Sequence, residues 1–341
     1  MSESLRLALA FLVACGATLL LTPLAIALAR RTGFYDSPVG YKGHLRPTPY
    51  LGGTAVVAGL LVSGALLARG ATEFLPIALG ALALLAAGTI DDRYGLGPLP
   101  RLLVEVGAGG ALFAAGIGWS IFAGDALNLA LSILFVIGVV NAYNLMDNMD
   151  GATGTVAAVS GVGLGVLAAV GGNAELGAIA LALSGACVGF LRFNLASPSR
   201  IFLGDGGSMA IGFALAATIM ALPHAGHLSW ALVPVTVVLV GLPALDTSLV
   251  VVSRLRRDAG VFSGARDHLT HRLRSKLGSA RRVALALAAA QAVLCGAGIA
   301  LFELDRSIAL AGSASLILLG IGAVAVLESP QWAPAVSESS A

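Results

Sequence analysis

ALNLALSILFVIGVVNAYNLMDNMDG, residues 126–151, is an apolar run that ends on two carboxylates, Asp147 and Asp150. As a helix rising about 1.5 Å per residue, the part 126–143 is long enough to cross the roughly 30 Å hydrocarbon core of a bilayer. Acids at the end of such a run are expected at the membrane surface. The stretch therefore predicts a spanning helix that delivers two carboxylates to a water–lipid boundary.

The whole chain has the same character. Hydrophobic residues make up 57% of its 341 residues and charged residues only 11%, whereas soluble domains carry about 25% charged residues. Cys15, Cys187 and Cys295 each lie alone in an apolar run, which indicates small buried side chains and neither disulfides nor a cysteine metal site. The composition predicts an all-α polytopic membrane protein.

Eleven apolar stretches are candidate transmembrane helices. They cover residues 6–29, 51–68, 74–90, 102–118, 126–143, 154–171, 175–191, 207–222, 229–252, 283–302 and 307–327. Several are short and rich in glycine, which close helix packing in lipid allows. We expect one transmembrane domain over residues 1–327 and a disordered tail over 328–341.

The basic residues predict the orientation. Of the 20 Lys and Arg residues, 17 fall in one alternate set of loops, and only Arg6, Arg69 and Arg306 fall in the other. By the positive-inside rule the crowded side is cytoplasmic, so the N-terminus is expected outside and the C-terminus inside. The polar motifs all fall on the cytoplasmic face. A transporter would more typically place its ionisable residues near the bilayer midplane.

Five carboxylates follow or begin predicted helices on that face: Asp91, Asp92, Asp147, Asp150 and Asp205. If these helix ends converge, the carboxylates repel one another unless a cation lies among them. Oxygen ligands favour Mg²⁺, with Mn²⁺ as an alternative. Solvated helix ends, helix caps or partners for nearby arginines are the alternatives for any single pair. Asp147 and Asp150, three apart, would lie on one side of a helical turn, whereas the adjacent Asp91 and Asp92 would diverge by about 100°.

Three further segments could bind anions. LGDGGS at 203–208 precedes an apolar span, so its backbone N–H groups could hold a phosphate, although an ordinary capped turn explains it equally. The basic loop 253–282 contains Arg266, Asp267, His268 and His271, which could neutralise a pyrophosphate or, like its other charges, face lipid headgroups. The first cytoplasmic loop offers a further set of cationic side chains, which could instead simply flank a span: Lys42, His44 and Arg46.

Four motifs in one order then resemble a known family. They are GTIDDR at 88–93, NAYNLMDNMDG at 141–151, FNLASPSRIFLGDGGS at 193–208 and RDHLTHRL at 266–273. Together they are similar to the polyprenyl-phosphate N-acetylhexosamine-1-phosphate transferases, over roughly residues 42–275. The resemblance implies ten or eleven helices and an Mg²⁺-dependent transfer of a sugar-1-phosphate from a UDP-N-acetylhexosamine to a polyprenyl phosphate, with release of UMP. It also implies a multi-pass protein of the bacterial plasma membrane, a cytoplasmic active site and a possible homodimer; no nucleic-acid partner is expected.

The resemblance also implies roles for individual residues. Asp205 is the expected Mg²⁺ ligand, supported by Asp147 and Asp150, which could instead contact the nucleotide-sugar. Asp91 or Asp92 would position the metal or the lipid phosphate and could accept its proton. The expected substrate contacts are Asn144 and Asn194 as hydrogen-bonding groups, Phe202 against uracil, and Lys42, His44, Arg46, Arg266, His268 and His271 toward the phosphates or sugar.

Two departures from the family pattern bear on the substrate. Asn148 occupies a position where the family often has Gly, and HLTH at 268–271 replaces a run of consecutive histidines. The interrupted histidine block favours a GlcNAc-1-phosphate transferase that starts surface glycans over the phospho-N-acetylmuramoyl-pentapeptide transferase of peptidoglycan synthesis. A transporter or flippase of a phosphorylated metabolite is the alternative from another class.

Overall fold

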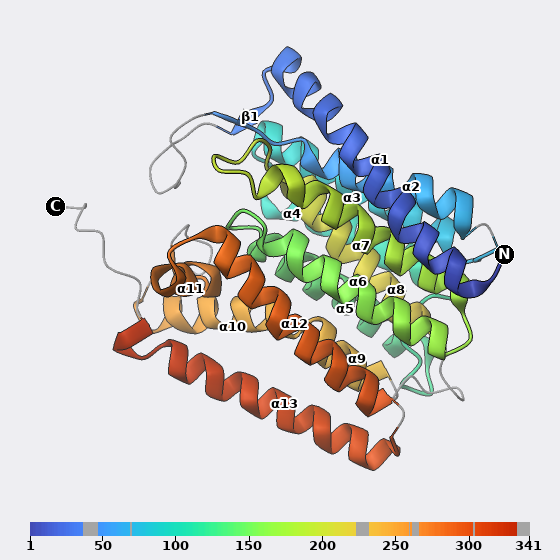
Figure 1. The fold of residues 1–341 in the computed structure, drawn as a ribbon. Coiled ribbons are helices and arrows are strands. Elements are labelled where there is room, and N and C mark those ends of the chain that lie inside the picture. Colours follow the sequence, from blue (N-terminus) through green and yellow to red (C-terminus); the bar gives the residue numbers. More distant parts are fainter. Residues whose placement is uncertain are drawn as a thin grey trace.

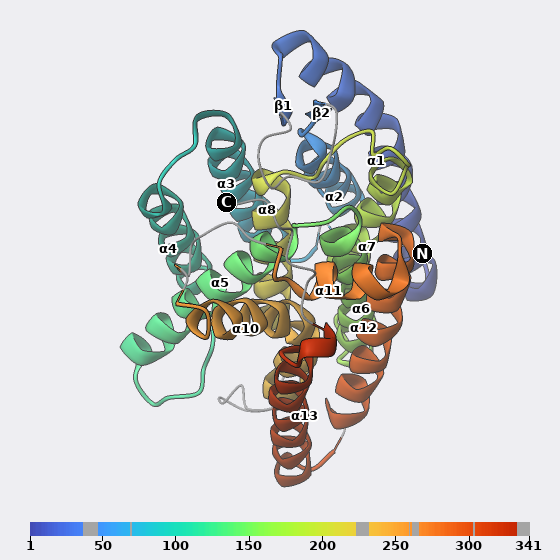
Figure 2. The ribbon, with the colours of Figure 1, turned by 90° about the vertical axis from the view of Figure 1, so that its left-hand side faces the viewer.

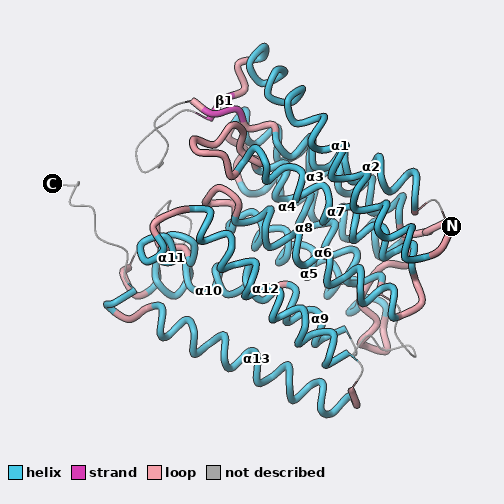
Figure 3. The backbone as a smooth tube through the Cα atoms, in the orientation of Figure 1, coloured by secondary structure: helices cyan, strands magenta, loops and turns pink. Residues whose placement is uncertain are grey.

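A computed structural model describes residues 1–36, 47–68, 70–222, 232–258, 260, 266–302 and 304–332. These residues form an elongated bundle of α-helices (Figure 1), and the loops are short compared with the helices (Figure 3). The strands among the described residues are β1 (Tyr35–Asp36) and β2 (Thr48–Pro49), which pair antiparallel. The predicted all-α fold is confirmed. Lys42, His44 and Arg46 lie outside the described residues, so their predicted role is not tested.

The helices of the first two thirds of the chain are α1 (Glu3–Thr32), α2 (Gly52–Leu67), α3 (Phe74–Tyr94), α4 (Pro98–Ala114), α5 (Asp125–Met146), α6 (Ala152–Val170), α7 (Ala174–Asn194) and α8 (Asp205–Ala221). The later helices are α9 (Leu232–Leu239), α10 (Gly241–Leu255), α11 (Leu269–Leu277), α12 (Ala280–Phe302) and α13 (Arg306–Leu327). The segment 328–341, expected to be a disordered tail, begins with a 3₁₀ helix, η2 (Pro330–Trp332), and its remainder lies outside the described residues.

Small residues let the central helices approach closely. Helix α7 packs on both α1 and α6. A Cβ atom added to Gly185 of α7 would lie 2.1 Å from the carbonyl oxygen of Phe11 in α1, and one added to Gly161 of α6 would lie 2.8 Å from the carbonyl oxygen of Ala180 in α7. Helix packing in lipid depends on such contacts, because hydrocarbon tails are as apolar as the side chains themselves. The many glycines are therefore part of the packing.

The predicted span 229–252 is not one continuous helix over its described residues. It is broken into α9 and α10, whose axes differ by 59°, and α10 runs across the direction of α13 (Figure 2). Pro243 has no N–H to donate to the carbonyl of Leu239 four residues earlier. The hydroxyls of Tyr143 and Ser160 each lie 3.5 Å from that carbonyl oxygen. The break carries α10 to the end of the bundle where α5 ends.

The number of spans remains a prediction. Seven described helices are long and apolar enough to cross a membrane alone, or eight if α9 and α10 form one bent span. Helices α2 and α8 are apolar but only 16 and 17 residues long. Helix α8 is buried along most of its length by α3, α5 and α2. Helix α1 begins at the end of the bundle opposite to the end of α13 (Figure 1), as an odd number of spans requires.

Candidate active site

The start of α8 packs closely between α2 and α3 because four glycines lack side chains. A Cβ atom on Gly88 of α3 would lie 2.4 Å from the amide nitrogen of Gly206. A Cβ atom on Gly53 of α2 would lie 2.3 Å from the Cα atom of Gly207. The glycines of the motif at 203–208 therefore allow backbone contact, which places Asp205 directly beside the acidic end of α3.

Asp92 binds the start of α8, where the sequence indicates a possible phosphate-binding site. Its Oδ1 atom accepts a 3.1 Å hydrogen bond from the amide of Asp205. Gly204 has a φ of +80°, and a Cβ atom there would lie 2.6 Å from the Asp92 Oδ2 atom, so glycine is required both for the turn and for the approach of this carboxylate. The first amide of α8 is thus bound within the protein, and an anion does not need to satisfy it.

Arg101 of α4 joins Asp91 and Asp205. Its Nη1 atom lies 2.7 Å from Asp91 Oδ2 and 3.0 Å from Asp205 Oδ2. Asp91 and Asp92 therefore contact different partners, as their angular separation predicts. From the sequence alone, Arg101 is one of the 17 basic residues that predict the orientation, and no site role is predicted for it. An arginine one turn into a helix that follows the DDR motif is the sequence signal that could have identified it.

Asp147 approaches the same group from α5. Burial and the charge of Asp205 raise its pKa to about 8, and the charge of Asp150 adds to this effect. The neighbouring Asn144 donates a 3.0 Å hydrogen bond to Ser208 of α8, which fixes the end of α5 against α8. We call Asp91, Asp92, Asp147 and Asp205 the aspartate cluster. Sequence reasoning predicted its members, and the structure brings them together.

The loop 147–151 is not the helical turn that we predicted. Helix α5 ends at Met146, and the three polar side chains that follow point to three different neighbours. Asp147 lies near Asp205 of the aspartate cluster. Asn148 contacts α10 and α11, and Asp150 accepts a 3.4 Å hydrogen bond from Asn194 at the end of α7. The i, i+3 spacing of the two acids therefore does not give them a common face, and the loop connects separate parts of the site.

Asn194 and Phe202 make hydrogen bonds that hold the segments around this loop in place. The buried Asn194 accepts a 2.6 Å hydrogen bond from the amide of Gly151 and donates a 3.0 Å bond to the carbonyl of Ile201. The amide of Phe202 donates to Pro49, and its carbonyl accepts from Gly52 at the start of α2. The predicted uracil and sugar contacts of these two residues are not tested; their described contacts are within the protein.

The predicted histidine pair lies at the start of α11. His268 precedes the helix, and its Nδ1 atom is 2.9 Å from Oδ2 of Asp246 on α10. His271 follows one turn later, with its ring centroid 6.0 Å from that of His268. Sequence reasoning missed Asp246, although a lone acid inside an apolar run is a signal for a functional group.

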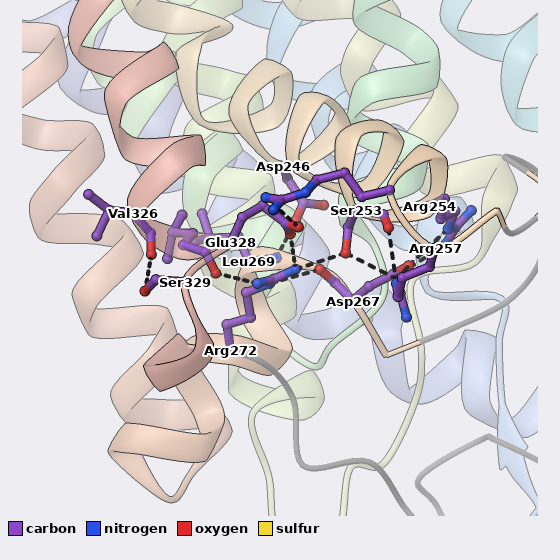
Figure 4. Close-up of polar contacts among 12 residues, drawn as sticks. Asp246, Ser253, Arg254, Arg257, Asp267, Leu269, Arg272, Val326, Glu328 and Ser329 are labelled. Atoms are coloured by element: carbon purple, nitrogen blue, oxygen red, sulfur yellow. Dashed lines mark hydrogen bonds and ion pairs between the residues drawn. The ribbon is translucent and has the colours of Figure 1, made fainter.

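A set of ion pairs surrounds this helix (Figure 4). We call it the α11 block; its members are Asp246, Arg254, Asp267, His268, Arg272 and Glu328. Arg254 binds both oxygens of Asp267, at 3.0 and 3.1 Å. Burial alone would raise the pKa of Asp267, but the hydrogen bonds and charge of Arg254 hold it below its ordinary value.

Arg272 extends the block to the end of α13. Its guanidinium bonds to Ser253, to the carbonyl of Leu327 and to the carboxylate of Glu328. Asp267 and Arg272 therefore support the framework, whereas Arg266, also predicted to bind substrate, is exposed at the start of this segment.

The donor set of the aspartate cluster suits a hard cation such as Mg²⁺. Within the described ranges, no group of three or more His, Cys, Asp or Glu side chains is positioned as a complete metal-ligand set. Mg²⁺ is commonly held by one or two carboxylates together with substrate phosphates, so a complete protein cage is not required. The raised pKa of Asp147 indicates a carboxylate that a nearby cation would stabilise. The residues thus fit the predicted metal, with Asp205 and Asp147 as the candidate ligands.

Comparison with known proteins connects this geometry to a family. Residues 74–223 match the model of glycosyl transferase family 4. The decaprenyl-phosphate N-acetylglucosaminephosphotransferase of Mycobacterium tuberculosis is 32% identical over 320 residues, covering 82% of this chain and 78% of that protein. The chain belongs to glycosyl transferase family 4. Its similarity extends to the enzyme of the same name in Mycolicibacterium smegmatis, 32% identical over 321 residues with the same coverage of both chains.

A more distant relative is the undecaprenyl-phosphate alpha-N-acetylglucosaminyl 1-phosphate transferase of Escherichia coli, 25% identical over 291 residues, or 80% of this chain and 77% of that protein. In the present chain, the segment matched by the family model, residues 74–223, contains the whole aspartate cluster. The α11 block lies beyond that segment.

Proposed function

We propose that this protein transfers N-acetylglucosamine-1-phosphate from UDP-N-acetylglucosamine to a polyprenyl phosphate. The observation that carries the proposal is the aspartate cluster at the end of an apolar bundle, in a family whose similar members are named for this transfer. One substrate is polar and the other is a lipid with an anionic head. They can meet only at a membrane surface, where the polar ends of apolar helices lie.

The reaction requires control of negative charge. An oxygen of the polyprenyl phosphate forms a bond to the sugar-bearing phosphorus, the bond from that phosphorus to the bridging oxygen breaks, and UMP leaves with that oxygen. When bound, Mg²⁺ would offset the charge of both phosphate groups. Asp205 and Asp147 would hold the metal, and Arg101 limits repulsion by pairing with Asp91 and Asp205. Asp92 fixes Asp205 through its backbone amide.

The names of the relatives favour this donor over the phospho-N-acetylmuramoyl-pentapeptide of peptidoglycan synthesis. Membership of a transferase family disfavours the transporter alternative. We further propose that the active site faces the cytoplasm of a bacterial plasma membrane, because the positive-inside rule places the aspartate cluster on that side. Homodimer formation remains a prediction from the resemblance.

A lipid-product assay tests the proposal. Purified protein in detergent would be incubated with Mg²⁺, decaprenyl or undecaprenyl phosphate, and UDP-N-acetylglucosamine labelled in the sugar. We expect labelled lipid and UMP in equal amounts, loss of both with EDTA, and recovery when Mg²⁺ is restored. UDP-N-acetylmuramoyl-pentapeptide serves as the competing donor. A labelled lipid formed only from that donor, or none from either, would contradict the proposal.

A further inference from the structure

The two histidines near the start of α11 have different surroundings. His268 and Asp246 have side-chain exposures of only 8% and 0%, and their 2.9 Å contact occupies the Nδ1 atom of the imidazole. A carboxylate can only accept a hydrogen bond, so Nδ1 of His268 carries the proton. His268 is therefore held in one orientation, with a proton on Nδ1, by a residue of another helix.

Asp246 also holds the backbone of α11. Its Oδ1 atom accepts a 2.6 Å hydrogen bond from the amide of Leu269, the first residue of the helix. That amide has no partner within the helix itself, because the first N–H groups of any α-helix lack one. One carboxylate thus fixes both the histidine side chain and the start of the helix that follows it.

Asn148 fastens the same turn to the loop 147–151. The hydroxyl of Thr270 donates a hydrogen bond to Asn148 Oδ1, and Asn148 Nδ2 lies 3.5 Å from Asp246 Oδ2. The adjacent Asp147 belongs to the aspartate cluster and lies close enough to Asp205 for the two charges to interact. The position of α11 is therefore tied to the position of the carboxylates. Asn148, which departs from the common glycine of the family, is the connecting residue.

His271 is in a different state. It is half-buried, and its Nδ1 atom is buried without a hydrogen-bond partner in the described part of the chain. An unmade hydrogen bond at a buried nitrogen costs free energy, and such groups call for a functional explanation. Burial and the neighbouring charge of His268 lower the pKa of His271 to about 4, so the ring is neutral at pH 7. Because Nδ1 is buried, a neutral His271 can donate a hydrogen bond to an anionic oxygen only from Nε2.

We propose that Asp246 is a positioning residue that, together with Asn148, fixes His268 and the start of α11, so that of the two histidines to which the family resemblance gives a donor contact only His271 makes it. The identity of the donor in this proposal rests on the proposed function. The division between a supporting and a contacting histidine rests on the contacts of α10, α11 and the loop 147–151.

Chemical modification tests the division without relying on activity. Diethyl pyrocarbonate acylates accessible neutral imidazoles, and peptide mass spectrometry resolves the rate at each histidine. In the full-length protein we expect His271 to react and His268 to be protected. Asp246→Asn should raise the rate at His268 about tenfold, because the loss of a charge-assisted hydrogen bond releases the ring. Asp125→Asn, an exposed acid at the start of α5, is the matched control. Equal rates at both histidines, or no effect of Asp246→Asn, would overturn the positioning role.

Ligand protection and kinetics then test the contact. UDP-N-acetylglucosamine with Mg²⁺ should slow modification of His271, and His271→Gln should raise the KM for this donor about tenfold. Asp246→Asn and His268→Gln should each lower kcat, and the double variant should be no worse than the poorer single variant, because both remove one interaction. Asp246→Glu should restore part of kcat. Donor protection of His268 instead of His271 would overturn the assignment. Failure of the wild-type protein in the lipid-product assay would refute the proposed function and leave the Asp246→Asn result to judge the positioning role.

Discussion

The aspartate cluster and the α11 block balance their charges in opposite ways. Among the described residues, the ion-pair partner of the aspartate cluster is Arg101, which pairs with two of the four acids, Asp91 and Asp205. In the α11 block each acid has its own partner: Asp267 pairs with Arg254 and Glu328 with Arg272, and Asp246 hydrogen-bonds His268. Both groups contact the loop 147–151. The α11 block is largely buried, whereas the aspartate cluster is partly exposed, with a side-chain exposure of 36% at Asp205.

This difference separates a site from its framework. Like charges held close together are tolerated only where something else, such as a bound cation, reduces their repulsion. Buried charges that are paired need no bound cation. Removing one partner destabilises the folded protein, because it leaves the other charge buried and unpaired. The aspartate cluster is therefore expected to gain stability and lose activity when an acid is neutralised, whereas the α11 block should lose stability.

The largest expected effect is on activity in the aspartate cluster. Asp205→Asn should lower kcat by roughly 100- to 1000-fold, because it removes a charged group from the site of phosphoryl transfer. Its melting temperature in detergent should stay the same or rise, since one repelling charge is gone. The lipid-product assay and a thermal unfolding curve measure both properties, with Asp125→Asn as control. A variant that lost activity only because it no longer folds would break the comparison.

The second expected effect is on stability in the α11 block. Asp267→Asn should destabilise the protein by about 3 kcal/mol, because it leaves the buried Arg254 without a full counter-charge. Arg257 pairs with the same carboxylate at 2.8 Å, but its side chain is 52% exposed. Arg257→Gln should therefore cost no more than about 1 kcal/mol. Denaturation of both variants measures the difference, and equal losses would show that burial does not set the strength of these pairs.

Arg101 provides a sharper test of the charge imbalance. Arg101→Met removes the cation beside Asp91 and Asp205, so the cluster becomes more negative and Mg²⁺ should bind about fivefold more tightly or better. The value of kcat should nevertheless fall, because the bound anions lose a counter-charge. Titrating Mg²⁺ against the initial rate measures the change, and Arg101→Lys is the matched control. If Arg101→Met needed a higher Mg²⁺ concentration to reach half of its maximal rate, Mg²⁺ would bind more weakly. That result would contradict a cluster that is short of positive charge.

What could be predicted from sequence follows the range of the interactions. Helices, their apolar lengths and the acids at their ends depend on neighbouring residues, so the members of the aspartate cluster were identified. Asp246 was missed because its partner His268 lies 22 positions away and on another helix. The sequence leaves phosphate binding and an ordinary turn open for the glycines before and within α8, because their neighbours Gly53 and Gly88 come from distant segments. Asn148 was noted only as a departure from a family pattern, and its contact with Thr270 gives it a physical role.

The smallest expected effect concerns the pH dependence of stability. The pKa of His271 is about 4 in the folded protein, held down by burial and by His268, Arg266 and Arg274, against a partial opposing effect of Asp246. An unfolded histidine titrates near 6.5. Between these values the unfolded chain binds a proton that the folded protein does not, so stability falls as the pH is lowered from about 7 toward 4. His271→Gln removes this contribution, and the fall in melting temperature between pH 7.5 and pH 5 should shrink by on the order of 2 °C. An unchanged or steeper fall in the variant would mean that His271 is not held neutral by its surroundings, and its role as a neutral donor to the substrate would have to be abandoned.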